Sequence, residues 1–371
     1  MIYADNAATT QLAPEALAAM MPYLQTEYGN ASQLYSFSRE TKKALKEARE
    51  TIAACINALP EEIYFTSGGT ESDNWALKGT MLVYGDHRAL ITSQIEHHAI
   101  LHSAKAIEKM GYPVAYLPVD GFGIVSSETL EKYITDNTKL VSVMFSNNEV
   151  GTVEPIKELA SIAHKFGALF HTDAVQALGH VPIDVKELNV DMLSASAHKF
   201  NGPKGIGFLY IKKGCEINPY ADGGSQEFGM RAGTENVAAI VGMATALQLN
   251  VHHMQENTRK LLSLEQQLVE SLDKVGIDYK RNGALKHVPG NMSFSFRGYE
   301  GEMILHRLDL KGICVSTGSA CDSKNTQVSH VLQAMHIDEE YALGTIRISL
   351  GVSNTVDEVK IIADAISSII K

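Results

Sequence analysis

The chain has 371 residues, of which 45% are hydrophobic and 20% charged, so it is long enough for two domains. The formal net charge of −11, without clusters of Lys and Arg, argues against nucleic acid or an anionic membrane as the main partner. The N-terminus MIYADNAATT has neither the basic n-region nor the apolar h-region of a signal peptide. No run approaches the ~18 apolar residues of a membrane span, so a cytoplasmic protein is expected.

Helical and strand patterns alternate along the first part of the chain. Helices are expected near 40–57, 72–84, 98–110 and 155–166. Short apolar strands are expected at 62–66, 88–93, 113–117, 140–145, 168–172, 191–196 and 207–211. This alternation predicts an α/β fold with a mostly parallel sheet that is covered by helices.

A long helix is expected over about 236–274, and the segments after it indicate a smaller α+β unit. These segments are NMSFSF, GEMILHRLDL, TIRISLG and DEVKIIADAISSII. The domain boundary is placed inside the long helix. It gives a large domain of residues 15–252 and a small domain of residues 1–14 and 253–371, because the first residues are too short to fold alone.

Polar clusters follow several of the expected strands. The segment TSGGTESDN runs through paired glycines into a helix that begins near Thr70, an arrangement that aims backbone N–H groups at an anion. Gly-Gly is also common in ordinary turns, so this signal is weak alone. His97 and His98 follow the next strand, where a histidine is either structural or, beside a ligand crevice, a proton carrier or stacking group.

Two further clusters contain Asp173 with Gln176, and Lys199 with its neighbours. Asp173 is either a helix N-cap or a carboxylate that faces a pyridine nitrogen and keeps that ring protonated. Lysine is usually exposed and inert, but Lys199 follows a strand, where an open α/β sheet keeps its ligand crevice. An amine there can form a Schiff base with an aldehyde cofactor, while Ser196 and His198 hold a phosphate.

The four cysteines form no CxxC pair, so neither a disulfide framework nor a structural zinc site is indicated. Cys55 and Cys314 lie in apolar patterns and are expected to be buried packing residues. Cys215 follows a turn and has no identified partner. Cys321 lies in STGSACDSKNTQ, whose small polar residues cannot bury it, and an exposed thiol in a reducing compartment favours a chemical use.

The motifs taken together resemble one enzyme family over the whole chain, from Tyr3 to about Gly351. They are DNAATT, TSGGTESDN, IEHHAIL, SNNEVGTVEPI, HTDAVQALG, SAHKFNGPKGIG, RAGTENVAAIVGM, STGSACDSK and IRISLG. Their order and wording closely resemble the cysteine desulfurases, which are pyridoxal-phosphate enzymes of fold type I. The spacing from GSAC to SHVL resembles the long-loop group. The resemblance implies a large cofactor-binding domain and a small domain with the catalytic cysteine loop.

The resemblance also implies residue roles around the cofactor. Lys199 is the Schiff-base lysine, Asp173 pairs with the pyridinium, Gln176 bonds the phenolic oxygen, and His97 stacks on the ring and handles protons. The phosphate is held by Gly69, Thr70, Ser196, His198 and, from the other subunit, Thr234. A homodimer is therefore implied, and no metal ion is expected.

The remaining implied roles concern the substrate, L-cysteine. Arg347, Asn30 and Asn148 bind its carboxylate. The Cys321 thiolate attacks its sulfur, which leaves alanine and a persulfide on Cys321 for a sulfur-acceptor protein, in iron-sulfur cluster assembly or in tRNA or cofactor thiolation. Two alternatives stay open: a selenocysteine lyase, and a non-catalytic sulfur carrier or scaffold. Rates on the two substrates and a spectrum of the purified protein discriminate them.

Overall fold

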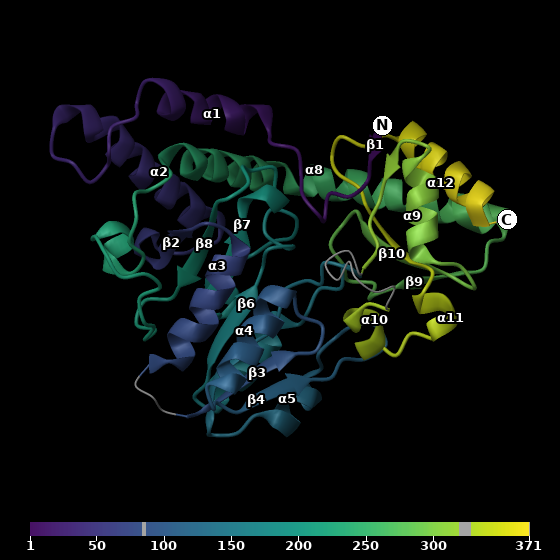
Figure 1. The fold of residues 1–371 in the computed structure, drawn as a ribbon, viewed down its shortest axis with the longest axis horizontal. Coiled ribbons are helices and arrows are strands. Elements are labelled where there is room, and N and C mark those ends of the chain that lie inside the picture. Colours follow the sequence, from purple (N-terminus) through teal and green to yellow (C-terminus); the bar gives the residue numbers. More distant parts are fainter. Residues whose placement is uncertain (84–86, 319–327, 371) are drawn as a thin grey trace.

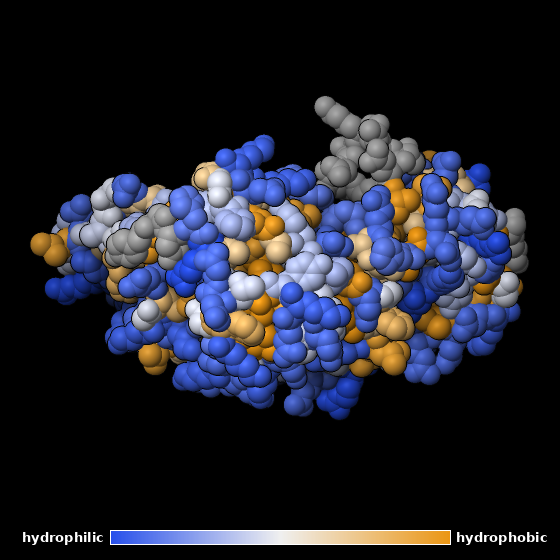
Figure 2. All heavy atoms as spheres, turned by 90° about the horizontal axis from the view of Figure 1, so that it is seen from below, coloured by the Kyte–Doolittle hydropathy of each residue, from blue (hydrophilic) through white to orange (hydrophobic). Residues whose placement is uncertain are grey.

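The computed structural model describes residues 1–83, 87–318 and 328–370. Figure 1 shows two groups of strands and helices, and helix α8 (Val237–Val275) extends from one group to the other. Within the described ranges, the helices lack the combination of length and apolar composition needed to cross a membrane. Figure 2 shows a face on which hydrophobic residues lie in separate groups among hydrophilic ones.

The larger group contains a seven-stranded sheet in the order β2-β8-β7-β6-β5-β3-β4. Its strands are β2 (Ile63–Thr66), β3 (Ala89–Ser93), β4 (Val114–Leu117), β5 (Thr138–Ser142), β6 (Leu169–Asp173), β7 (Met192–Ser196) and β8 (Gly207–Ile211). Strand β8 is antiparallel to β2 and β7, whereas the pairs β7–β6, β6–β5, β5–β3 and β3–β4 are parallel. The mostly parallel sheet is confirmed, and β2, β3, β5, β6 and β7 end at one common edge.

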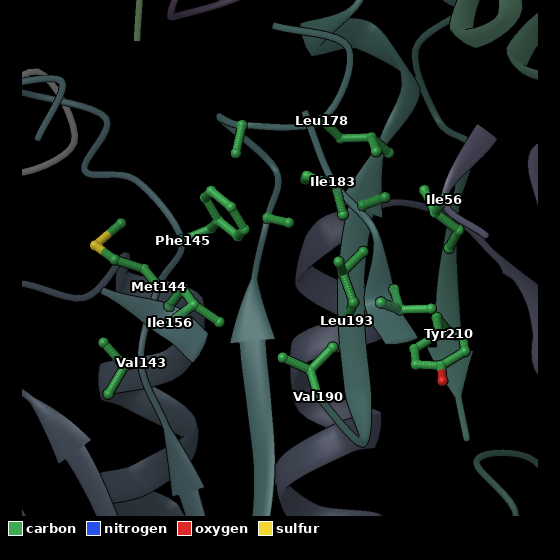
Figure 3. Close-up of a cluster of buried hydrophobic side chains, with 14 of the residues drawn as sticks. Ile56, Val143, Met144, Phe145, Ile156, Leu178, Ile183, Val190, Leu193 and Tyr210 are labelled. Carbon is green, nitrogen blue, oxygen red and sulfur yellow. The ribbon is translucent and has the colours of Figure 1, made fainter. Parts of the chain in front are cut away.

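Helices cover both faces of this sheet. They include α1 (Pro14–Gln25), α2 (Arg39–Cys55), α3 (Gly69–Asn74), α4 (His98–Lys109), α5 (Ser127–Tyr133), α6 (Ile156–Lys165) and α7 (Val185–Leu188). Successive strand residues point to opposite faces, so Leu90 and Leu140 join one apolar cluster while Ile91 and Val141 join the other. The second cluster also contains side chains of α2, α6 and α8, and Figure 3 shows part of it.

Helix α1 differs from the expectation, because the sequence pattern does not predict it. Pro14 starts this helix and Pro22 lies inside it. Only Ala16 is buried among its residues, so the helix has little of the apolar periodicity that reveals a helix in a sequence. Strand β5 also differs, since it covers Thr138–Ser142 instead of residues 140–145.

The smaller group is built on an antiparallel sheet in the order β12-β10-β9. Its elements are β9 (Tyr279–Asn282), β10 (Asn291–Phe296), α9 (Gly301–Asp309), α10 (His330–Ala334), α11 (Glu339–Ala342), β12 (Thr345–Ser349) and α12 (Val356–Ile370). Strand β1 (Ile2–Tyr3) pairs in parallel with β11 (Ile313–Cys314), so the N-terminus packs with the C-terminal group as expected.

Helix α8 contributes to the cores of both groups. Ile240 and Leu247 belong to the core beneath the seven-stranded sheet, whereas Leu261 and Leu268 pack with strands β10 and β12. The helix ends at Gly276, which adopts a left-handed conformation with φ of 73°. Because the first part of α8 packs in one core and the second part in the other, a domain boundary within α8 is supported. Its position near residue 252 stays a prediction.

Candidate active site

The glycine pair after β2 lies against the end of β7. A Cβ atom on Gly68 would lie 3.6 Å from Oγ of Ser196, and Gly68 has a φ of +148°, which disfavours other residues. A Cβ on Gly69 would lie only 2.6 Å from a methyl group of Val175. The positive φ of Gly68 and the close approach at Gly69 explain the two glycines, and the contact from Gly68 lies beside Ser196.

Lys199 follows β7 directly, in the short 3₁₀ turn Ala197–Lys199. Its Nζ atom donates hydrogen bonds to the carbonyl oxygens of Ala7, at 2.5 Å, and Ala8, at 2.9 Å. Both carbonyls belong to the DNAATT segment, so the N-terminus reaches the edge of the sheet where the strands end. The lysine is therefore held by backbone from a distant part of the sequence.

Asp173 is the last residue of β6 and is buried. Its Oδ1 atom accepts a hydrogen bond of 2.9 Å from the backbone N–H of Val175. Burial raises the pKa of Asp173 to about 6, although the hydrogen bond from Val175 and the charge of Lys199 act in the opposite direction. A carboxylate oxygen of Asp173, one of Asp73 and a ring nitrogen of His97 lie within 4.8 Å of one another.

His97 is the N-cap residue of α4, and its Nδ1 atom accepts a hydrogen bond of 3.2 Å from the N–H of Ala99. Burial, followed by the charge of Lys199, lowers the pKa of His97 to about 4. The imidazole is therefore neutral at pH 7. Because Nδ1 is an acceptor, the proton of the neutral ring lies on Nε2.

Gln176 and His198 are both tied to the N-terminal segment. Gln176 donates from Nε2 to the carbonyl oxygen of Ala7 at 2.9 Å. The Nδ1 atom of His198 lies 3.1 Å from Oγ1 of Thr9. Burial lowers the pKa of His198 to about 4, with Lys199 acting in the same direction, so this imidazole is neutral as well. Thr9 is a neighbour of the site that the sequence analysis misses.

Thr70 and Thr234 are exposed. Arg231 pairs with Glu71 at 2.8 Å, which holds the segment before Thr234 near the start of α3. Within the described ranges, no hydrogen bond joins Thr234 to Thr70 or His198. Thr234 therefore has no hydrogen bond of this kind within one protomer.

Arg347 on β12 is 6% exposed and already has protein partners. Its Nη2 atom lies 2.7 Å from Oδ1 of Asp5, and Nη1 donates to the backbone carbonyl of Asn148 at 2.9 Å. Its Nε atom has no hydrogen-bond partner among the described residues. Arg347 and Asn148 are thus in contact, and Oδ1 of Asn30 accepts a hydrogen bond from the N–H of Ser32.

The cysteine expected to carry sulfur, Cys321, lies outside the described residues. The three described cysteines are unpaired and half-buried, and Cys55 packs against the core as expected of a packing residue. Burial raises the pKa of Cys55 to about 11 and that of Cys215 to about 12. Both thiols are therefore protonated at neutral pH and are poor nucleophiles.

Sequence analysis also misses three buried or partly buried carboxyl groups, those of Asp5, Asp73 and Glu149. Glu149 accepts a hydrogen bond of 2.5 Å from Oγ of Ser329, and burial raises its pKa to about 7. All three residues lie inside the quoted motifs. Their partners are distant in sequence, so the motifs alone give no sign of these contacts.

The arrangement has the parts that pyridoxal phosphate requires. Lys199 supplies an amine for its aldehyde, Asp173 a buried carboxylate for its pyridine nitrogen, and His97 a neutral ring. The tight glycine turn beside Ser196 leaves backbone and a hydroxyl facing the space where a phosphate is expected. The residues present therefore fit this cofactor.

The chain is similar to known proteins over nearly its whole length. The profile of the aminotransferase class-V family matches residues 2–362. Cysteine desulfurase IscS of Clostridium botulinum strain Hall is 49% identical over 376 residues, which cover 100% of this chain and 94% of the relative. A solved NifS-like protein superposes with a TM-score of 0.94 at 39% identity, covering 99% of this chain and 98% of its own. The structure of SspA in complex with cysteine gives a TM-score of 0.85 at 34% identity, covering 96% of this chain and 100% of its own.

Proposed function

The chain belongs to the aminotransferase class-V family and is a pyridoxal-phosphate-dependent cysteine desulfurase, and we propose that the active site lies where Lys199, Asp173 and His97 meet. The observation that carries this proposal is their convergence at one edge of the sheet. Asp173 and His97 have atoms within 4.8 Å of each other, and the charge of Lys199 affects the pKa of both.

Eight described residues would hold the cofactor in one protomer. They are Lys199 and Asp173, with Gln176 and His97 at the ring and Gly69, Thr70, Ser196 and His198 toward the phosphate. Bound pyridoxal phosphate supplies an electron sink for the charge that develops on the α-carbon of the substrate. The negative charge of Asp173 favours a protonated pyridine nitrogen, which strengthens that sink.

Proton transfer at the α-carbon falls to Lys199 and His97. The Lys199 amine takes the α-proton of the substrate, since the DNAATT carbonyls hold its Nζ at the strand ends. His97, neutral and with its Nε2 atom protonated, is a hydrogen-bond donor in this site. Arg347 orients the substrate by binding its carboxylate, for which the unpartnered Nε–H is a suitable donor.

Sulfur transfer is assigned to Cys321. Its thiolate attacks the sulfur of L-cysteine, the carbon–sulfur bond breaks, and a sulfur–sulfur bond forms on Cys321 while the carbon product takes up protons and leaves as alanine. The reaction thus converts L-cysteine and the Cys321 thiol to L-alanine and a Cys321 persulfide. A sulfur-acceptor protein of the cytoplasm then takes the outer sulfur, for iron-sulfur cluster assembly or for tRNA or cofactor thiolation.

Arg347→Ala is expected to weaken binding of L-cysteine about 30-fold, because a buried, charge-assisted contact contributes on the order of 2 kcal/mol. Saturation of the spectral change on adding L-cysteine measures this effect. The visible band of the bound cofactor should persist, since Arg347 does not hold the cofactor. Arg297, an exposed arginine paired with Glu340 at 2.9 Å, provides the control as Arg297→Ala. Saturation of Arg347→Ala at the parental concentration would exclude Arg347 as the carboxylate anchor.

A homodimer with shared active sites is proposed from the position of Thr234. Thr234 is exposed, and the family resemblance assigns its contact to the phosphate of the other subunit. Exposed apolar side chains, those of Tyr28, Leu34, Phe37 and Phe228, lie in two segments that a hydrogen bond from Gln226 to Ser32 brings together. Such a surface is suited to burial against a second copy of the chain.

A mixing experiment tests the shared site. Lys199→Ala and Thr234→Asp are each expected to have low activity, because the first lacks the amine and the second places a negative charge against the phosphate. If Thr234 serves the partner's site, a mixed dimer contains one intact site and regains about half the parental activity. If Thr234 serves its own protomer, both sites of the mixed dimer stay damaged and no activity returns.

A further inference from the structure

A second carboxyl group, that of Asp73 on α3, lies beside Asp173. Asp73 is 1% exposed, and its Oδ1 atom has no hydrogen-bond partner among the described residues. One of its oxygens lies within 4.8 Å of a carboxylate oxygen of Asp173. None of the roles assigned above uses this group, so its presence in a buried site needs an explanation.

The nearest imidazole does not neutralise Asp73. His171 is fully buried, and its ring nitrogens lie 2.9 Å from Oγ of Ser142 and 2.9 Å from Oγ of Ser194. Its Nε2 atom lies 3.9 Å from Oδ1 of Asp73, beyond hydrogen-bond distance. Burial lowers the pKa of His171 to about 3, so the ring carries no charge at pH 7.

Two other titratable groups around Asp73, Glu96 and His97, are also uncharged at pH 7 and do not neutralise it. Glu96 accepts hydrogen bonds from Ser93 and Met144, and burial raises its pKa to about 8, so it is protonated at pH 7. His97 is neutral for the reasons given above. Lys199 is the cation of this region, and its charge lowers the pKa of Asp173.

Two buried carboxylates at this distance repel each other strongly if both are ionised, so the pair retains one proton. Burial, followed by the charge of Asp173, raises the pKa of Asp73 well above its ordinary value, while Ser194 acts in the opposite direction. The N–H of Val175 and the charge of Lys199 favour ionisation of Asp173 instead. The proton therefore belongs to Asp73.

We propose that Asp73 is a positioning residue that stays protonated and donates a hydrogen bond to Asp173, which fixes one negative charge opposite the pyridine nitrogen of the cofactor. This inference rests on the proposed cofactor site. The donors of Val175, in the turn after β6, and of Asp73 on α3 then hold Asp173 from two sides of the chain. The site carries a single negative charge, which matches the single positive charge of a protonated pyridine ring.

The test compares Asp73→Asn with Asp73→Ala in the full-length protein. An asparagine amide keeps a neutral donor at this position, so Asp73→Asn is expected to bind pyridoxal phosphate within about threefold of the parent. The pH midpoint of its visible cofactor band should also stay unchanged. Asp73→Ala removes the donor and should weaken cofactor binding about tenfold or more. An infrared spectrum of the cofactor-free protein should lose one protonated-carboxyl stretch in both variants.

The opposite protonation state gives a different pattern. If Asp73 is ionised, both variants remove a negative charge near the ring and lower the midpoint of the visible band to the same extent. No protonated-carboxyl stretch then disappears. Either result would overturn the inference.

Two further variants separate this inference from the proposed site. Asp173→Asn should greatly weaken cofactor binding, and normal binding in that variant would contradict the proposed site itself. Asp191→Asn is the matched control, because Asp191 is also buried but lies before β7, where its carboxylate pairs with His164 at 2.7 Å. It should leave cofactor affinity and the band midpoint at parental values.

Discussion

Replacing Lys199 by alanine is expected to abolish the conversion of L-cysteine to L-alanine, with a loss of more than about a thousandfold in turnover. The same change should remove the visible absorption band of the lysine-bound cofactor. Both effects are expected from one cause, since the proposed role of this amine is both to bind the cofactor aldehyde and to move the α-proton. Pyridoxal phosphate should still bind, more weakly, through the groups around Gly69 and Ser196. An absorption spectrum and an alanine assay measure the two effects.

A matched lysine is available as the control. Lys204 is exposed in the turn that follows Lys199, and Lys204→Ala is expected to keep both the band and the activity. This comparison separates the loss of one particular amine from the loss of positive charge near the turn. An unchanged visible band together with normal alanine production in Lys199→Ala would show that another residue binds the cofactor.

Cys321→Ser is expected to retain the fold, the bound cofactor and the spectral response to L-cysteine, but to lose persulfide formation and nearly all sulfide release. The proposed cofactor site is built on Lys199, Asp173 and His97, none of which this change replaces. A serine hydroxyl is far less ionised than a thiol at neutral pH and far less suited to attack sulfur. Mass spectrometry after a pulse of L-cysteine detects the added sulfur and locates it on the chain.

The other cysteines provide the controls for this experiment. Cys55→Ser, Cys215→Ser and Cys314→Ser should each leave the persulfide on Cys321. Burial keeps the thiols of Cys55 and Cys215 protonated, so neither is expected to replace Cys321. A persulfide on one of these three residues, or full alanine output from Cys321→Ser, would refute the assignment. The enzyme would then release sulfur without a protein carrier.

The fold and part of the site were predictable from the sequence for a local reason. Strands such as β3 and β7 are short apolar runs that end in polar residues, and the segments between them have helical periodicity. Parallel strands end at one edge, so residues that follow them, such as Asp173 and Lys199, meet there. Each of these inferences uses only neighbours in the sequence and one rule about sheets.

Local patterns fail where an element buries few residues or a role depends on a distant partner. Helix α1 buries Ala16 alone, so it leaves little periodic signal. Asn148 contacts Arg347 through its backbone carbonyl, so the side-chain type of Asn148 gives no sign of this contact.

The sequence by itself predicted the α/β class from local patterns, and its resemblance to the cysteine desulfurases implied the roles of Lys199, Asp173 and Cys321. Only the tertiary structure determines which ionisable side chains from distant parts of the sequence lie close to one another. Asp5 and Arg347 are separated by 342 positions yet lie 2.7 Å apart, and the packing of α3 on the sheet brings Asp73 to Asp173. The energy of a buried charge depends on its surroundings within a few ångströms, which the packing of distant segments creates.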